Sequence, residues 1–210
     1  MTLNYNSFIF IRDHEGLDQP WRWPGESSGI TIGRGFDLGY NTKESLRSAW
    51  GKYLDDPTLT KLGTAIGVRG EAAKILAPKY NGIVIRAEHA DAVLRDHTLP
   101  AFERLTLRAF PGSDALPPDA FGALVSLTYN RGASCIGERR MEMAEIAGLT
   151  AIYSERVRLS PVPTDLQSRT LTAIADAIRR MKRLWPLNRG LRLRRDAEAK
   201  MVEGAISHGE

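Results

Sequence analysis

Hydrophobic residues recur at a spacing of three or four along most of the chain, which is the period of an amphipathic helix. The pattern predicts helices over residues 4–16, 41–50, 57–77 (one or two short ones), 87–109, 116–132, 138–159, 165–183 and 190–204. Pro100 is expected to kink or split its helix, and Gly148 to break the helix over 138–159. Pro161-Val162-Pro163 is interpreted as a connector.

Residues 17–40 favour strands and turns rather than helices. Ile30, Thr31 and Ile32 favour a strand, and the glycines on either side favour tight turns. We therefore expect a small β-hairpin in this segment. A hairpin near the start followed by many helices predicts an α+β fold.

The chain has 210 residues, of which 42% are hydrophobic and 26% are charged. These values are typical of a globular protein of one domain or of one domain with two lobes. A single cysteine, Cys135, excludes an internal disulfide and argues against a cysteine-based zinc site. His14-Glu15 begins like a zinc-hydrolase motif, but Asp18 stands where the second histidine is needed, so we expect neither a metal nor a cofactor.

The net charge is +4, and the basic residues concentrate near the end of the chain. Residues 179–200 hold nine lysines and arginines against two acids. This run is interpreted either as a solvated helix face or as a surface for a polyanion such as an anionic cell wall. No nucleic-acid-binding motif accompanies it, so nucleic acid is not an expected partner.

No segment approaches the roughly 18 apolar residues of a membrane-spanning helix. The first residues lack a basic start, and their apolar run is only Phe8 to Ile11. They do not form a secretory signal. We expect a protein that is made in the cytoplasm and leaves it only by release or delivery.

Glu15 stands at the end of the first predicted helix. The negative end of a helix dipole disfavours a carboxylate, so the pKa of Glu15 is expected to rise, as a general acid requires at neutral pH. A surface glutamate near a helix end is the alternative interpretation.

Thr31 and Asp37 form the second part of the pattern. In a strand, Thr31 points to the face opposite Ile30 and Ile32, and Asp37 returns beside it after the turn. A carboxylate and a hydroxyl placed together can hold and deprotonate a water. The alternative is a glycine-rich turn in which Asp37 satisfies its own backbone.

Several ordered segments resemble the phage-type lysozymes, a family of muramidases and endolysins. His14-Glu15-Gly16-Leu17 followed by Thr31-Ile32-Gly33-Arg34-Gly35 resembles the catalytic segment of the family. Segments 85–96, 123–132 and 190–199 resemble three of its helices, in the same order. The resemblance implies one lysozyme-like domain over 1–210, with a small hairpin-bearing lobe over 17–85 and a helical lobe over 86–210 that packs with helix 4–16.

One position departs from the best-known members of the family. They place an aspartate six residues before the threonine, where this chain has Gly25, with Glu26 as the nearest acid. A pesticin-like branch places its catalytic aspartate six residues after the threonine, and Thr31 and Asp37 have that spacing. The resemblance therefore favours Asp37 over Glu26.

The resemblance implies hydrolysis of the β-1,4 bond between N-acetylmuramic acid and N-acetylglucosamine. Glu15 would protonate the leaving oxygen, while Asp37 with Thr31 would activate a water on the opposite face, which is an inverting mechanism. Tyr129 and Asn130 would contact the sugar, with a helix-terminal role as the alternative for Asn130. Arg194 or its neighbour Arg195 would reach Glu15.

The implied partner is bacterial peptidoglycan, reached in the periplasm by a monomer that a holin or a secretion apparatus releases. An immunity protein is a further partner of such an enzyme. The alternative function is a lysozyme-fold protein without catalysis, serving as a binding or structural part of a phage tail or secretion machine. The retention of Glu15, Thr31 and Asp37 together argues against that loss.

Overall fold

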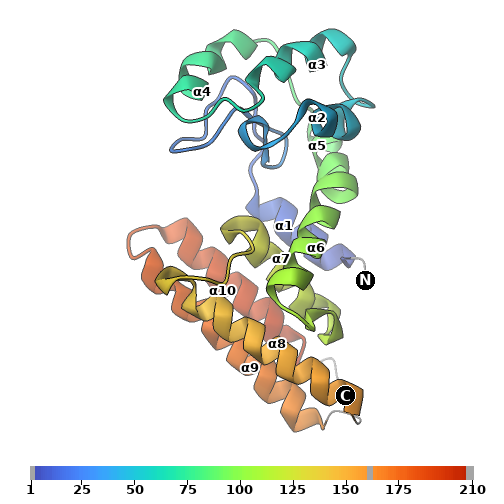
Figure 1. Cartoon of the computed structure of the whole chain (residues 1–210), viewed down its shortest axis with the longest axis vertical. Helices are drawn as coiled ribbons and strands as arrows, with labels where there is room; N and C mark the ends of the chain where they lie inside the picture. The colour runs from blue at the N-terminus through green and yellow to red at the C-terminus, as the bar shows by residue number, and fades with distance from the viewer. Residues whose placement is uncertain (1–2, 160–162, 207–210) are drawn as a thin grey trace. The chain divides into compact units, whose positions relative to one another are not determined.

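The structure is a computed structural model that describes residues 3–159 and 163–206. Most of these residues lie in helices (Figure 1). One short antiparallel hairpin supplies the sheet. This composition agrees with the expected α+β class. The chain divides into two compact units. The hairpin unit comprises Arg12–Leu99, and the helical unit comprises Met1–Ile11 with Pro100–Glu210.

The hairpin unit holds a two-stranded sheet and several short helices. Its elements are β1 (Thr31–Ile32), β2 (Phe36–Asp37), α2 (Lys43–Trp50), α3 (Asp56–Leu62), α4 (Glu71–Leu76) and α5 (Ala87–Val93), and α1 (Tyr5–His14) leads into it. Ile30 and Ile32 are fully buried and pack with Trp50 and Tyr80 in one apolar cluster. This cluster fixes which face of the hairpin is turned inward.

The start of α2 differs by a residue or two from the prediction. Thr42, rather than Asn41, caps the helix, because its hydroxyl accepts from the Ser45 N–H while the Ser45 hydroxyl accepts from the Thr42 N–H. Asn41 donates instead to the carbonyl of Asp37 at 2.8 Å. Asn41, with which the predicted helix began, therefore contacts the end of the hairpin instead.

The predicted helix over 87–109 forms with a local distortion next to Pro100. α5 and α6 (Leu99–Ala109) are joined by a π-helical turn over Leu94–Thr98. Proline lacks the N–H that an α-helix needs there, and a wider turn accommodates the loss. The division between the two units falls between Leu99 and Pro100.

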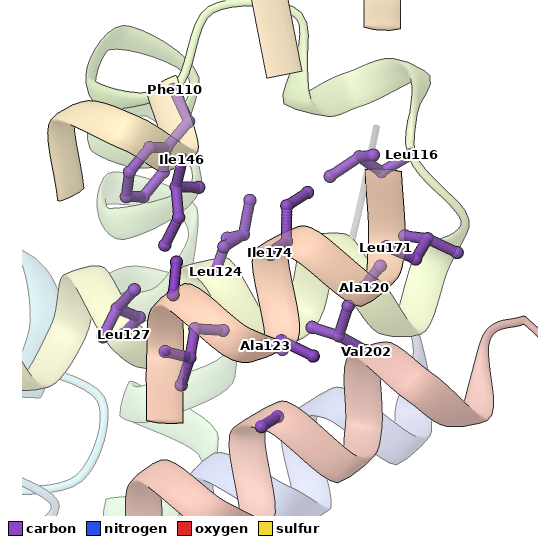
Figure 2. Close-up of a cluster of buried hydrophobic side chains, with 14 of the residues drawn as sticks. Phe110, Leu116, Ala120, Ala123, Leu124, Leu127, Ile146, Leu171, Ile174 and Val202 are labelled. Atoms are coloured by element: carbon purple, nitrogen blue, oxygen red, sulfur yellow. The ribbon is translucent and has the colours of Figure 1, made fainter. Parts of the chain in front are cut away.

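The helical unit is built from α6, α7 (Pro118–Arg131), α8 (Met141–Leu159), α9 (Thr164–Arg180) and α10 (Arg189–Gly204). α9 packs against both α8 and α10, and α10 also packs against α7. Figure 2 shows how Leu124 of α7, Ile174 of α9 and Val202 of α10 share one buried cluster. This core is separate from the cluster of the hairpin unit.

One prediction for the helical unit is confirmed and another is wrong. α7 ends at Gly132, as predicted, with a φ of 79° that favours glycine. The prediction that Gly148 breaks its helix is wrong, because α8 runs unbroken through it. A single glycine costs a helix about 1 kcal/mol, which the packing of α8 outweighs. The expected connector over 161–163 lies, apart from Pro163, outside the described residues.

Part of the basic run over 179–200 is neutralised by acids of neighbouring helices. Its ion pairs join Arg179 to Glu203, Arg180 to Glu145, Lys182 to Asp196 and Arg183 to Glu142. Sequence counting could not show these pairs, since two of the acids come from α8. Within the described ranges, no helix has the length and apolar character needed to cross a membrane.

Candidate active site

Glu15 follows directly after the last residue of α1, His14. Its N–H donates to the Arg12 carbonyl at 3.2 Å, so its backbone continues the helical turn. Arg34, in the turn between β1 and β2, donates to the carbonyl of Glu15 at 3.2 Å and pairs with Asp91 at 2.8 Å. The hairpin turn is therefore attached to the segment that carries the candidate acid.

The chain after Glu15 lies alongside the hairpin. Asp18 and Gly33 form an antiparallel bridge, with N–H to carbonyl distances of 2.7 and 3.0 Å. Gly33 and Gly35 have φ values of 67° and 76°, a left-handed conformation that side chains disfavour. The glycines of this motif therefore serve the tight turn that places Arg34.

Thr31 and Asp37 lie directly opposite each other in the two strands. The neighbouring pair is joined by the Leu38 N–H to Ile30 carbonyl bond of 2.8 Å, so Thr31 and Asp37 form a non-hydrogen-bonded pair, in which side chains approach most closely. Thr31 is only 5% exposed and Asp37 is half-buried. The structure thus brings the predicted hydroxyl and carboxylate together on one face of the hairpin.

The Asp37 carboxylate is held by three backbone contacts. The Gly29 N–H approaches both of its oxygens, at 3.1 and 3.0 Å, and the Gly39 N–H donates to Oδ1 at 2.8 Å. A Cβ at Gly29 would lie 2.4 Å from Oδ1 of Asp37 and 2.5 Å from the Gly39 nitrogen. Gly29 is therefore required for the approach that fixes this carboxylate.

Replacing Gly29 by alanine is expected to reduce the hydrolytic activity that the lysozyme resemblance implies by about 100-fold, the scale of loss that misplacement of a catalytic group by about 1 Å produces. The new methyl group occupies the place of the Asp37 carboxylate and displaces it. The rate of this implied hydrolysis measures the effect. Gly148→Ala is the matched control, since its Cβ meets nothing within 4 Å. Equal activity of Gly29→Ala and wild type would contradict the assignment of Asp37.

Sequence reasoning missed Asp18 as a functional candidate. Burial raises the pKa of the Asp18 carboxyl above its ordinary value, the N–H of Gly35 and the Arg34 guanidinium lower it in part, and the Asp37 charge raises it further. A raised pKa and a nearby second carboxylate are features of acid–base sites. The only sequence signal was an acid three residues after Glu15, because the bridge to Gly33 is a tertiary contact.

Glu26, the alternative second carboxylate, lies outside the strand pair. It is exposed and occupies a turn with a φ of 52°. It is the one non-glycine residue with positive φ in the described part of the chain. The strand register thus sets Asp37, and not Glu26, opposite Thr31.

The other predicted site residues belong to the helical unit. The Tyr129 ring lies against Phe102, with 4.6 Å between ring centres. Asn130 is exposed, and its side-chain oxygen accepts from Arg195 at 3.1 Å. Arg194 is 5% exposed and donates to Ser126 and Glu198. Substrate contacts by Tyr129, Asn130 and Arg194 stay a prediction.

Comparison with known proteins adds no assignment: no protein-family model matches the chain, and no curated protein matches it. The hairpin unit contains three acidic groups that could take part in chemistry. Glu15 is half-buried at a helix end, and Asp37 is fixed opposite the Thr31 hydroxyl. The third is Asp18, whose pKa is raised. Groups of these kinds can protonate a leaving oxygen and activate a water.

Proposed function

We propose that the protein is a peptidoglycan hydrolase that cleaves the β-1,4 bond between N-acetylmuramic acid and N-acetylglucosamine, on a lysozyme-like fold. The observation that carries the proposal is the hairpin itself. Its strands set Asp37 opposite Thr31, and its turn residue Arg34 contacts the backbone of Glu15. All three predicted catalytic residues thus belong to one unit of the structure.

Each residue has a role that follows from its surroundings. Glu15, which follows directly after α1, is the proposed general acid that protonates the leaving oxygen. Asp37, which backbone N–H groups hold in one orientation, accepts a proton from the attacking water, and the Thr31 hydroxyl positions that water. An activated water that attacks from the opposite face inverts the anomeric carbon.

The proposed place of action is the periplasm. The substrate is the bacterial cell wall, and a monomer reaches that wall after release by a holin or delivery by a secretion apparatus. The proposed chemistry uses carboxyl groups and water and requires no cofactor. A protein that lyses cells in this way also creates a need for an immunity protein in its producer.

The test is the loss of turbidity of purified sacculi with the wild type and with Glu15→Gln. We expect clearing by the wild type and a loss of about 100-fold or more for the variant, since general acid catalysis contributes roughly 10²–10⁴-fold. Proton NMR of the fresh product is expected to show the α anomer. A folded wild type that leaves sacculi intact would contradict the proposal and favour a non-catalytic binding component.

A further inference from the structure

Several arginines gather around Trp185 in the helical unit. The guanidinium carbon of Arg131, at the end of α7, lies 4.8 Å from the centre of the Trp185 ring, and that of Arg195 in α10 lies 5.7 Å from it. Arg140, which precedes α8, acts electrostatically on Arg131. Two segments thus place cations against Trp185, and a third places Arg140 near enough to act electrostatically on Arg131.

These arginines carry buried N–H groups that have no acceptor. They are Nε and Nη1 of Arg131, Nη1 of Arg140 and Nη1 of Arg195. Arg195 is fully buried, and Nη2 of Arg131 donates to the Arg139 carbonyl at 2.7 Å. Buried donors in folded proteins nearly always have a partner, so a group of unsatisfied guanidinium donors indicates a missing acceptor.

The two nearby carboxylates are already engaged in ion pairs, although Oε2 of Glu198 and Nε of Arg195 lie close together without a well-aligned hydrogen bond. Glu142 is paired with Arg183 at 2.7 Å, and Glu198 is shared between Arg194 at 3.3 Å and Arg195 at 2.8 Å. Within the described residues, neither Arg131 nor Arg140 forms an ion pair with a carboxylate. The charges of these two arginines are therefore not neutralised by an ion pair.

The electrostatics of Arg131 agree with this lack of an ion pair. Burial, together with the charges of Arg140 and Arg195, lowers the pKa of Arg131 to about 10, while the charge of Glu142 opposes the shift. An arginine whose pKa is lowered in this way is charged at neutral pH at a cost in stability. A bound anion would remove that cost.

We propose that Arg131, Arg140 and Arg195 form a binding site for a phosphate group beside Trp185. Guanidinium groups bind phosphate and carboxylate oxygens through paired N–H donors. A phosphate dianion neutralises more positive charge than a carboxylate does, and it offers acceptors in several directions for donors from three segments. The site lies wholly in the helical unit, and Arg195 also donates to Asn130. Phosphate binding is measured without reference to hydrolysis, so its test does not rest on the proposed function.

The test is calorimetric titration of the full chain with inorganic phosphate at low ionic strength. We expect one phosphate per chain in the wild type and at least about tenfold weaker binding in Arg131→Gln and in Arg140→Gln, the loss of one charge-assisted pair. Arg156→Gln, an exposed position of α8, removes the same charge elsewhere and is expected to bind as the wild type does. Acetate is expected to bind more weakly than phosphate.

Two further arms identify the source of the phosphate. Binding of glycerol 3-phosphate that depends on Arg131 would support a site that accepts a phosphate ester. Binding of phosphatidylglycerol vesicles without binding of either small phosphate would overturn the proposal. So would a wild type that binds no phosphate, or equal affinities of Arg131→Gln, Arg140→Gln and Arg156→Gln.

Thermal unfolding separates this binding role from a structural one. Without phosphate, Arg131→Gln is expected to keep or raise the Tm, because the change removes a buried charge that lacks a partner. Added phosphate is expected to raise the Tm of the wild type more than that of the variant. A lower Tm for the variant with an unchanged phosphate effect would overturn the proposal.

Discussion

Replacing Glu198 by glutamine is expected to lower the free energy of unfolding by about 3–5 kcal/mol, the usual effect of breaking a buried ion pair. Glu198 is fully buried, and its Oε1 accepts from Ser126 at 2.7 Å and from Arg195 at 2.9 Å. Arg194 and Arg195 are both buried and both pair with this carboxylate. Glutamine keeps the size of the side chain but removes the negative charge that both buried guanidinium groups contact.

Glu203→Gln is the matched control for this experiment. Glu203 is also in α10 and pairs with Arg179, but the two side chains are 37% and 31% exposed. Solvent screens such a pair, so its loss is expected to change the free energy of unfolding by about 0–1 kcal/mol. Equilibrium unfolding in denaturant measures both variants. Similar small losses for Glu198→Gln and Glu203→Gln would show that Glu198 does not hold the core of the helical unit together.

Asp37→Asn is expected to reduce peptidoglycan cleavage by about 10²–10⁴-fold with little change in the fold. Asparagine retains an oxygen at the place of Oδ1, where the Gly29 and Gly39 N–H groups donate. It loses the charge with which Asp37 takes a proton from water. A large loss of activity at an unchanged Tm would therefore report the chemistry of this group rather than its structural contacts.

Two further substitutions show which acid acts with Glu15. Glu26→Gln is expected to retain activity, because Glu26 is exposed and lies outside the strand pair. Asp18→Asn is expected to have an intermediate effect, since Asp18 adjoins the hairpin and its charge interacts with that of Asp37. Activity that survives Asp37→Asn but is lost in Glu26→Gln would assign the base to Glu26.

Local signals in the sequence predict much of the helical structure. The end of α7 at Gly132 and the position of α2 follow from residues adjacent in the chain. Gly148 failed as a signal, because packing outweighs the modest helix preference of one residue. Pro100 shows another limit of local sequence signals. The proline predicts that the helix is distorted, but it does not predict that the distortion is a π-helical turn.

The candidate sites also contain some residues that the sequence predicts and others that it does not. The pairing of Thr31 with Asp37 follows from strand alternation and one tight turn, both of which the sequence shows. The bridge between Asp18 and Gly33 depends on the fold, so Asp18 could not be singled out. The arginine cluster around Trp185 could not be predicted either, because Arg131, Arg140 and Arg195 come from separate segments.

The measurement that tests the central claim most directly is the identity of the reducing end released from sacculi. Digestion by the wild type, reduction with borohydride and mass spectrometry are expected to show fragments ending in reduced N-acetylmuramic acid. Glu15→Gln is expected to release none. Fragments that end in reduced N-acetylglucosamine, or equal release by the wild type and Glu15→Gln, would contradict the assignment of Glu15, Thr31 and Asp37 as a muramidase site.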